Sequence, residues 1–388
     1  MIHRTFRAPV AALAGLAVTI PAAAQAQTYQ SEHHAFRAVP IAEGLNNPWS
    51  IAFLPGGDIL ITERAGRLRI VRNGQLLESP VEGVPEVRAR GQGGLLEVAL
   101  HPQFESNRFL YLTYSKPNAD GSEGTTAVAR GRFENDRLTD VQDIFVAEAW
   151  SRGGNHFGSR IAFDSDGYLF VTVGDRGASP DPATVRSHPA QDLSNHQGTV
   201  NRLHDDGRIP ADNPFVGRSD AQPSIWSYGH RNLQGLAYDA TTGYLWENEH
   251  GPQGGDELNL IRRGGNYGWP VIGYGLQYGG SVIHQSTSSE GMQQPAHYWV
   301  PSIATSGLMI YRGDRFPAWR GSAFSGGLAG EQIARVTLNG ERATGVEVLM
   351  RGVGRVRDIR EGPDGFIYVA LDHRGGGPTA VLRLEPVD

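Results

Sequence analysis

The chain has 388 residues, 51 of them glycine and 23 proline, and its formal net charge is −6 at pH 7. This acidic balance argues against nucleic-acid binding, which depends on clustered arginine and lysine. Because 39% of the residues are hydrophobic and only 20% are charged, the chain can bury a large core and wholesale disorder is not expected.

Two residue types are scarce. The chain has no cysteine, so it must be stabilised by packing or by metal rather than by disulfides. Lys116 is the only lysine, and arginine carries almost all of the positive charge. Mechanisms that need a placed amine, such as Schiff-base formation or phosphate binding by lysine, are therefore improbable.

The N-terminus has the pattern of a secretory signal peptide. Arg4 and Arg7 precede an apolar run over residues 9–20, and small residues follow as far as Ala26. We expect a signal peptide over residues 1–26 and a periplasmic or secreted mature protein. The apolar run is short for a membrane span, although a membrane anchor is the alternative, and no later segment is apolar enough for membrane insertion.

From residue 27 onward the chain is dominated by strand signals, and helical periodicity is scarce. Short alternating apolar runs are bounded by Gly, Asp, Asn and Pro, and tight turns such as Asp166-Gly167 and Asp364-Gly365 join them. Six stretches share this pattern of a strand, a turn and a returning strand: Pro48–Val71, Leu95–Ser115, Ser159–Asp175, Leu233–Gly251, Ser302–Leu338 and Val356–Leu384.

Repetition of such units predicts an all-β, six-bladed β-propeller with four-stranded antiparallel blades. A single small sheet cannot bury both faces, and arranging the sheets around an axis solves this. We predict one propeller catalytic domain over residues 27–388, because no linker-like stretch divides it. In a propeller, loops from distant segments meet at one end of the central channel.

Polar side chains at the ends of these predicted strands are candidates for one site. His156, an imidazole base, lies just before a buried strand, and two amides and three guanidiniums occupy similar positions. Converging on one face, they would suit an anionic ligand rich in carbonyl groups. Arg355 and Arg357 alternate with Val356, so both point the same way on a strand. The amides and guanidiniums are Gln92, Asn232, Arg231, Arg355 and Arg357.

Five motifs in matching order make the chain resemble the soluble pyrroloquinoline-quinone (PQQ) dependent sugar dehydrogenases of the glucose/sorbosone dehydrogenase family, in particular the shorter aldose sugar dehydrogenases. The resemblance covers nearly the whole mature chain and implies a six-bladed propeller. The motifs are GQGGLLEVALHP (91–102), GNHFGSRIAF (154–163), WSYGHRNLQGLAYD (226–239), ENEHGPQGGDELNLIRRGGNYGWP (247–270) and RGVGRVRDIREGPDG (351–365).

The resemblance implies oxidation of an aldose at the anomeric carbon to the lactone, with electrons passed through PQQ to an external acceptor. It makes His156 the general base, a role that suits a group titrating near neutrality. Arg231 would act at the reacting quinone. PQQ itself would be bound by Gln92, Arg231, Asn232, Arg355 and Arg357.

The resemblance also implies calcium, whose preferred ligands are oxygens. The main-chain carbonyls of Gly251 and Pro252 match the positions that bind the calcium held against PQQ. Asp256, Glu257 and Tyr267 match positions tied to a second, structural calcium. Without the resemblance, the acidic pair Asp256-Glu257 could equally be a solvated turn.

Several positions depart from the glucose dehydrogenases or are weaker matches. Asn155 stands where those enzymes have an aspartate before the base, and about Ala329 stands where they have a cofactor lysine. We predict that Arg176 supplies part of the missing positive charge. Trp299 matches an aromatic residue near the substrate, with packing in a blade core as the alternative.

Two other functions fit a propeller. A calcium-dependent lactonase or related hydrolase would need metal-ligating carboxylates around the channel and no arginine cluster. A non-catalytic binding module would not bring Gln92, Arg231 and Arg357 into one pocket.

Overall fold

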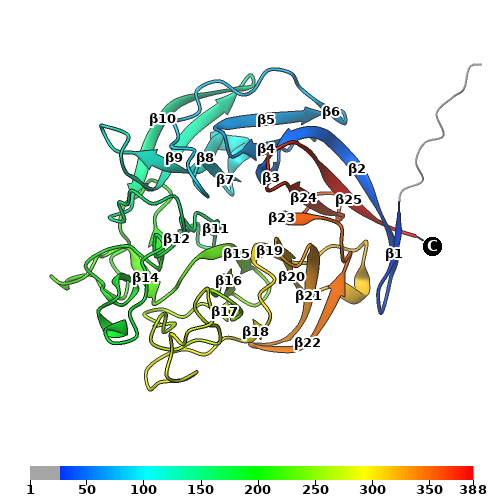
Figure 1. The fold of residues 1–388 in the computed structure, drawn as a ribbon. Coiled ribbons are helices and arrows are strands. Elements are labelled where there is room, and N and C mark those ends of the chain that lie inside the picture. Colours follow the sequence, from blue (N-terminus) through cyan, green and yellow to red (C-terminus); the bar gives the residue numbers. More distant parts are fainter. Residues whose placement is uncertain (1–26, 388) are drawn as a thin grey trace, which may run out of the picture.

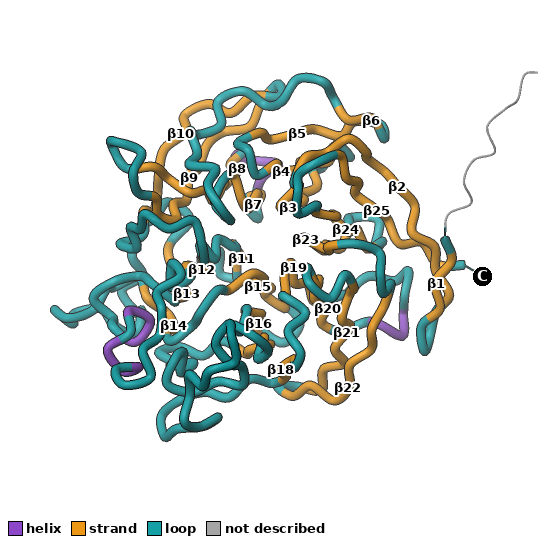
Figure 2. Tube along the Cα trace, in the orientation of Figure 1, coloured by secondary structure: helices purple, strands orange, loops and turns teal. Residues whose placement is uncertain are grey.

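The computed structural model describes residues 27–387, and the predicted signal peptide lies outside them. Six antiparallel sheets surround a central axis (Figure 1), so the prediction of a six-bladed β-propeller is confirmed. Between residues 27 and 387, helix is confined to α1 (Phe104–Asn107) and three short 3-10 helices (Figure 2), which are Val185–Ser187, Pro189–Gln191 and Pro317–Trp319. No helix within residues 27–387 is long and apolar enough to cross a membrane.

Three blades form the first half of the ring. One consists of β3 (Pro48–Phe53), β4 (Ile59–Glu63), β5 (Arg67–Arg72) and β6 (Gln75–Leu76). The next consists of β7 (Leu95–Leu100), β8 (Phe109–Pro117), β9 (Gly124–Glu134) and β10 (Arg137–Val146). The third consists of β11 (Ile161–Phe163), β12 (Leu169–Val173), β13 (Thr199–Leu203) and β14 (Ile225–Tyr228).

The second half follows the same plan. One blade consists of β15 (Leu233–Asp239), β16 (Tyr244–Glu249), β17 (Asp256–Leu260) and β18 (His297–Trp299). Another consists of β19 (Thr305–Ile310), β20 (Ala323–Gly327), β21 (Gln332–Asn339) and β22 (Arg342–Leu349). The last consists of β23 (Arg355–Glu361), β24 (Ile367–Asp372), β25 (Pro378–Pro386), β2 (Ala35–Asn46) and β1 (Thr28–Gln30).

The last blade closes the ring and differs from the prediction. Strand β2, from the N-terminal part of the chain, pairs with β25 from the C-terminal part, with Phe36 opposite Pro386 and Asn46 opposite Pro378. Strand β1 adds a fifth strand outside β2. Pairing the two ends of the chain within one sheet leaves no open gap between the first and last blades.

Apolar side chains fill the spaces between the blades. The largest rings, such as Trp319, Phe316 and Phe36, are fully buried in one such cluster, where Phe316 stacks on Trp319. Burying rings of this size is among the largest single contributions to stability.

Four charged side chains form an ion-pair network among the inner strands of the blades. Arg160 pairs with Glu97 at 2.8 Å and with Asp358 at 2.9 Å, and Arg360 pairs with both carboxylates from the other side. Arg160 also donates to the carbonyls of Gln234 and Arg357. This network ties together four of the six inner strands.

Topology explains where the site lies. The first strand of each blade starts at the edge where its antiparallel second strand ends. Positions just before β3, β7, β11, β15 and β19, and just after β4, β12, β16, β20 and β24, therefore gather at one end of the ring.

Candidate functional site

A cavity of about 860 Å³ lies at this end of the ring. One wall, from the first and last blades, carries Arg64, Arg355, Arg357 and Arg374. The lining also contains uncharged side chains such as Leu276, Val300 and Tyr278, and Tyr278 is 70% exposed. Other lining residues include Trp49, Gln92, Phe157, Gln234, His250, Pro252, Ala329 and Asp372.

His156 lies in the loop that leads into β11 and is paired with Asp175, which follows β12. Its Nδ1 is 2.6 Å from Oδ1 of Asp175, whose side chain is fully buried. Gly177 N–H and the Trp269 indole also donate to this carboxylate, each at 2.8 Å. While the imidazole is neutral, an ionised Asp175 holds the proton on Nδ1 of His156, and Nε2 then has a free lone pair.

The surroundings of Asp175 favour that ionised form. Burial opposes ionisation, but the charge and hydrogen bond of His156 and the nearby Arg231 guanidinium outweigh it, so the pKa of Asp175 lies below its ordinary value. Asp175 N–H also donates to the carbonyl of Arg231 at 2.8 Å. The predicted base and the predicted Arg231 therefore share one carboxylate neighbour.

Close packing of two loops fixes the backbone of His156. Its φ is 51°, in the left-handed region, and its N–H donates to Oε1 of Gln92 at 2.9 Å. Gln92 N–H donates in turn to the carbonyl of Gly154 at 2.7 Å. A Cβ on Gly91 would lie 2.5 Å from that same carbonyl oxygen, so glycine is needed for this approach. An uncommon φ in such a framework is typical of functional positions.

Arg231 spans the region between His156 and the loop after β16. Its Nη1 donates to the carbonyls of His250 and Gly251, at 3.1 and 3.0 Å, and its guanidinium lies 5.2 Å from the Trp269 ring. Arg231 does not line the large cavity but a small adjoining pocket, which shares His250 and Pro252 with it.

A chain of side-chain contacts connects these residues to the basic wall. Nδ2 of Asn232 is 3.4 Å from Nδ1 of His250, Gln234 donates to Asn232 at 3.1 Å, and Arg357 donates to Gln234 at 3.1 Å. Burial lowers the pKa of His250 to about 3, and the charges of Arg231, His156 and Arg357 add to this effect. All three groups therefore lie within electrostatic reach of His250.

Arg355 and Arg357 both face Asp372, the carboxylate of the cavity lining. Arg357 Nη2 and Arg355 Nε lie 3.5 and 3.7 Å from Oδ2 of Asp372, and Asn47 donates to Oδ1 at 2.6 Å. Burial and the charges of neighbouring arginines, opposed by Asp372, together lower the pKa of Arg357 to about 10. A site that crowds guanidiniums in this way favours a bound anion.

Arg176 and Trp299 are absent from the lining of the cavity, as are His156, Arg231 and Asn232. Arg176 stacks 3.5 Å from the centre of the Phe157 ring, and its guanidinium donates to main-chain carbonyls that include those of Ala149 and Asn155. Its hydrogen bonds are therefore used within the fold. Trp299, on the outermost strand β18, is 8% exposed and packs with Trp246 in a blade core. These contacts favour structural roles for both residues, and their predicted roles in cofactor and substrate binding stay predictions.

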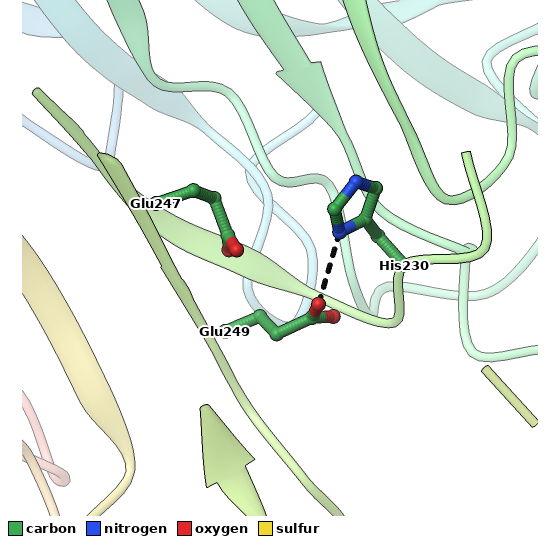
Figure 3. Close-up of side chains that lie close together, drawn as sticks. All are labelled: His230, Glu247 and Glu249. Carbon is green, nitrogen blue, oxygen red and sulfur yellow. Dashed lines mark hydrogen bonds and ion pairs between the residues drawn. The ribbon is translucent and has the colours of Figure 1, made fainter. Parts of the chain in front are cut away.

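A cluster of buried acids lies beside the small pocket (Figure 3). Glu247 and Glu249 lie on β16, close to His230. One potential metal-binding atom from each of the three side chains lies within 4.8 Å of the other two. His230 Nδ1 is 2.9 Å from Oε1 of Glu249. Asn259 contacts Glu247, Glu249 and Glu257 at 3.2 to 3.3 Å. Burial, together with the charge of Glu249, raises the pKa of Glu247 well above its usual range.

The predicted ligands of a structural calcium divide between two settings. Asp256 accepts from Ser302 with both oxygens and from Gly251 N–H, so its oxygens are already used. Glu257 lines the small pocket and belongs to the acid cluster. The Tyr267 ring stacks on His230 and its hydroxyl donates to the Leu260 carbonyl, which leaves its main-chain oxygen as the group that could bind a cation.

Sequence reasoning missed several residues that the structure brings to the site. Asp175 follows the strand that pairs with β11, and the rule of shared edges could have found it. Trp269 and Glu249 fall inside a quoted motif, but nothing in their spacing signals a contact with Asp175 or His230. His250 and Asp372 are signalled only by the cavity itself.

Comparisons with known proteins identify the family of the chain. Residues 45–383 match the model of the Glucose / Sorbosone dehydrogenase family. "Aldose sugar dehydrogenase YliI" of Escherichia coli is 42% identical over 352 residues, covering 89% of this chain and 92% of that protein. "Quinoprotein glucose dehydrogenase B" of Acinetobacter calcoaceticus is 31% identical, covering 73% and 62%.

Solved structures extend the similarity to three dimensions. The soluble aldose sugar dehydrogenase of Escherichia coli, in its apo form, gives a TM-score of 0.84 at 40% identity and covers 91% of this chain and all of that one. The PQQ-bound aldose sugar dehydrogenase of Streptomyces coelicolor gives 0.72 at 29% identity, covering 90% and 96%. The chain belongs to the glucose/sorbosone dehydrogenase family.

Proposed function

We propose that this protein is a quinoprotein that oxidises aldoses at the anomeric carbon to lactones. The proposed cofactor is PQQ with calcium, and electrons leave to an external acceptor. The observation that carries the proposal is the pairing of His156 with a buried, ionised Asp175 at the end of the ring that holds a strongly basic cavity.

The cavity suits a flat tricarboxylate. Its lining contains four arginines against the single carboxylate of Asp372, so the surplus charge is positive. Guanidiniums bind carboxylates in bidentate fashion. Gln92 and Asn232 add amides at the same end of the ring, and Arg355 and Arg357 would hold the carboxylates. PQQ, when bound, would accept a hydride from the sugar.

His156 would take the proton of the anomeric hydroxyl. Asp175 fixes the Nδ1–H tautomer, so Nε2 is the atom that receives the proton. The carboxylate also stabilises the imidazolium that forms, a role that Asn155 cannot fill because an amide carries no charge. Arg231 would stabilise negative charge that develops next to His156, because both residues contact Asp175 and Arg231 also donates to the His250 carbonyl.

Calcium would be held by main-chain oxygens of Gly251 and Pro252, with Glu257 and the Tyr267 carbonyl for a second ion. The donor set is made of hard oxygens, as calcium prefers. The Gly251 carbonyl accepts from Arg231, and an ion there would replace this hydrogen bond. Glu247 and Glu249 strengthen the case for the second ion, because buried carboxylates without a guanidinium partner favour a cation.

The test uses the purified protein supplied with PQQ and calcium, a panel of aldoses and an artificial dye as electron acceptor. We expect dye reduction with at least one aldose. Absence of dye reduction with the whole panel, despite a bound quinone, would overturn the proposal. Export to the periplasm or medium, with cleavage near Ala26, is proposed from the signal-like N-terminus and is tested by N-terminal sequencing of the exported protein.

A further inference from the structure

The basic wall of the cavity holds more positive charge than the residues assigned so far account for. Arg64 and Arg374 line it together with Arg355 and Arg357. Arg64 follows β4 in the first blade. Arg374 follows β24 in the last blade, which also contains β23. Asp372 is the one carboxylate among the lining residues.

Asp372 cannot neutralise four guanidiniums. Its Oδ1 accepts from Asn47, and its Oδ2 faces Arg355 and Arg357 at 3.7 and 3.5 Å. Within residues 27–387, neither Arg64 nor Arg374 lies within ion-pair distance of a carboxylate. Both guanidiniums can therefore bind an anion without first breaking an ion pair within the described residues.

Arg64 is held in a defined place by the main chain. Its Nη1 donates to the Gly91 carbonyl at 2.8 Å, one residue before Gln92, whose side chain accepts from His156 N–H. The charge of Arg64 contributes to the lowered pKa of Arg357, so the two guanidiniums lie within electrostatic reach. Arg64 thus contacts the loop that carries Gln92 and lines the same cavity as Arg357.

Arg374 extends the same wall at its exposed end. It lies two residues after Asp372, and its charge contributes to the lowered pKa of Arg355. Like charges held together in this way raise the free energy of the empty site, and a bound anion relieves that cost. Ala329, which stands about where the glucose dehydrogenases have a cofactor lysine, also lines the cavity but carries no charge.

We propose that Arg64 and Arg374 are further binding residues for the carboxylates of the anionic cofactor, an assignment that rests on the proposed PQQ-dependent function. Together with Arg355 and Arg357 they form a four-arginine wall for a planar di- or tricarboxylate. Arg64 and Arg374 thereby take the part that the sequence had led us to expect of Arg176.

The experiment is a titration of the purified apo-protein with PQQ at fixed calcium, followed by quenching of tryptophan fluorescence, since Trp49 lines the cavity. The variants are Arg64→Gln, Arg374→Gln and the double variant. Arg320→Gln is the matched control, because Arg320 is an exposed arginine whose Nε donates to a main-chain carbonyl away from the cavity. Thermal unfolding checks that each variant folds.

We expect the Kd for PQQ to rise about tenfold in each single variant and about a hundredfold in the double variant. Arg320→Gln should bind as the wild type does. The slope of log Kd against log salt concentration should also become shallower in the double variant, because fewer cations face the ligand. Arg64→Lys should recover part of the lost affinity.

Three results would overturn the inference, and they differ in whether the proposed function fails as well. If the wild type binds PQQ and the Arg64 and Arg374 variants bind equally well, only this assignment fails. If the wild type does not bind PQQ at all, the proposed function fails with it. A loss of affinity as large in Arg320→Gln as in Arg64→Gln would also contradict a specific role.

Discussion

The imidazole of His156 and the carboxylate of Asp175 meet at 2.6 Å, although 19 residues separate them in the chain. They are brought together because β11 and β12 are antiparallel neighbours, with His156 before the first and Asp175 after the second. The Trp269 indole, from the next blade, holds the other carboxylate oxygen. The tautomer of the proposed base is thus set by contacts that involve two blades.

Asp175→Asn should abolish most turnover while the protein stays folded. The amide would offer Nδ2–H to His156 and so favour the tautomer with the proton on Nε2, which cannot accept the sugar proton. We expect kcat to fall by at least about a hundredfold. Steady-state kinetics with an aldose and a dye acceptor provide the measurement, and a fluorescence titration should show little change in PQQ affinity. A variant with wild-type kcat would remove Asp175 from the mechanism.

Arg160→Met should destabilise the ring strongly. The substitution leaves Glu97 and Asp358 buried with only Arg360 as partner, and it removes the donors to the Gln234 and Arg357 carbonyls. Breaking a buried ion pair from one side typically costs about 3–5 kcal/mol. Denaturant unfolding should report a loss of this size. A loss below about 1 kcal/mol would show that the network contributes little.

Stability should fall on mild acidification partly because of His196. Burial lowers its pKa from 6.5 to about 4, so the folded protein holds it neutral while the unfolded chain binds a proton below pH 6.5. The free energy of unfolding is therefore unaffected by His196 above pH 6.5 and falls as the pH drops from 6.5 toward 4. At pH 5 the loss is about 2 kcal/mol.

His196→Gln should flatten this part of the pH dependence. Denaturant unfolding at pH 7.5 and pH 5 gives the comparison, and the wild-type difference should exceed that of the variant by about 2 kcal/mol. Equal differences in the two proteins would contradict the account of His196.

Trp299→Phe should affect stability but not sugar binding. Trp299 packs in a blade core, and its indole nitrogen has no hydrogen-bond partner among the described residues. We expect a loss of about 1–3 kcal/mol in the free energy of unfolding and an unchanged KM for aldoses. A large increase in KM without loss of stability would instead support the substrate role that its sequence position suggested.

The repeat pattern was enough to predict the propeller, because each of the six stretches holds the inner strands of one blade. The closing strand β2 was missed because its pairing with β25 spans the whole chain and leaves no local signal. The outer strands β13 and β14 were also missed, since a long loop separates them and their runs are short.

The site was predicted in part. Strand-end positions such as Arg355 and Arg357 are found at the cavity, because alternation on a strand places both on one side. The role predicted for Arg176 in cofactor binding stays a prediction, and its sequence position could not show that its guanidinium donates to main-chain carbonyls. Glu247 and Glu249 were not singled out because a buried acid cluster is recognised only when the strands are aligned.

The most direct test of the account is an anaerobic spectrum of the protein loaded with PQQ and calcium, recorded before and after addition of an aldose. The account predicts that the wild type converts the quinone absorption to that of the reduced form. His156→Ala should bind the quinone equally well but leave its spectrum unchanged. A wild-type spectrum that no aldose alters, or a His156→Ala protein that reduces the quinone as fast as the wild type, would contradict it.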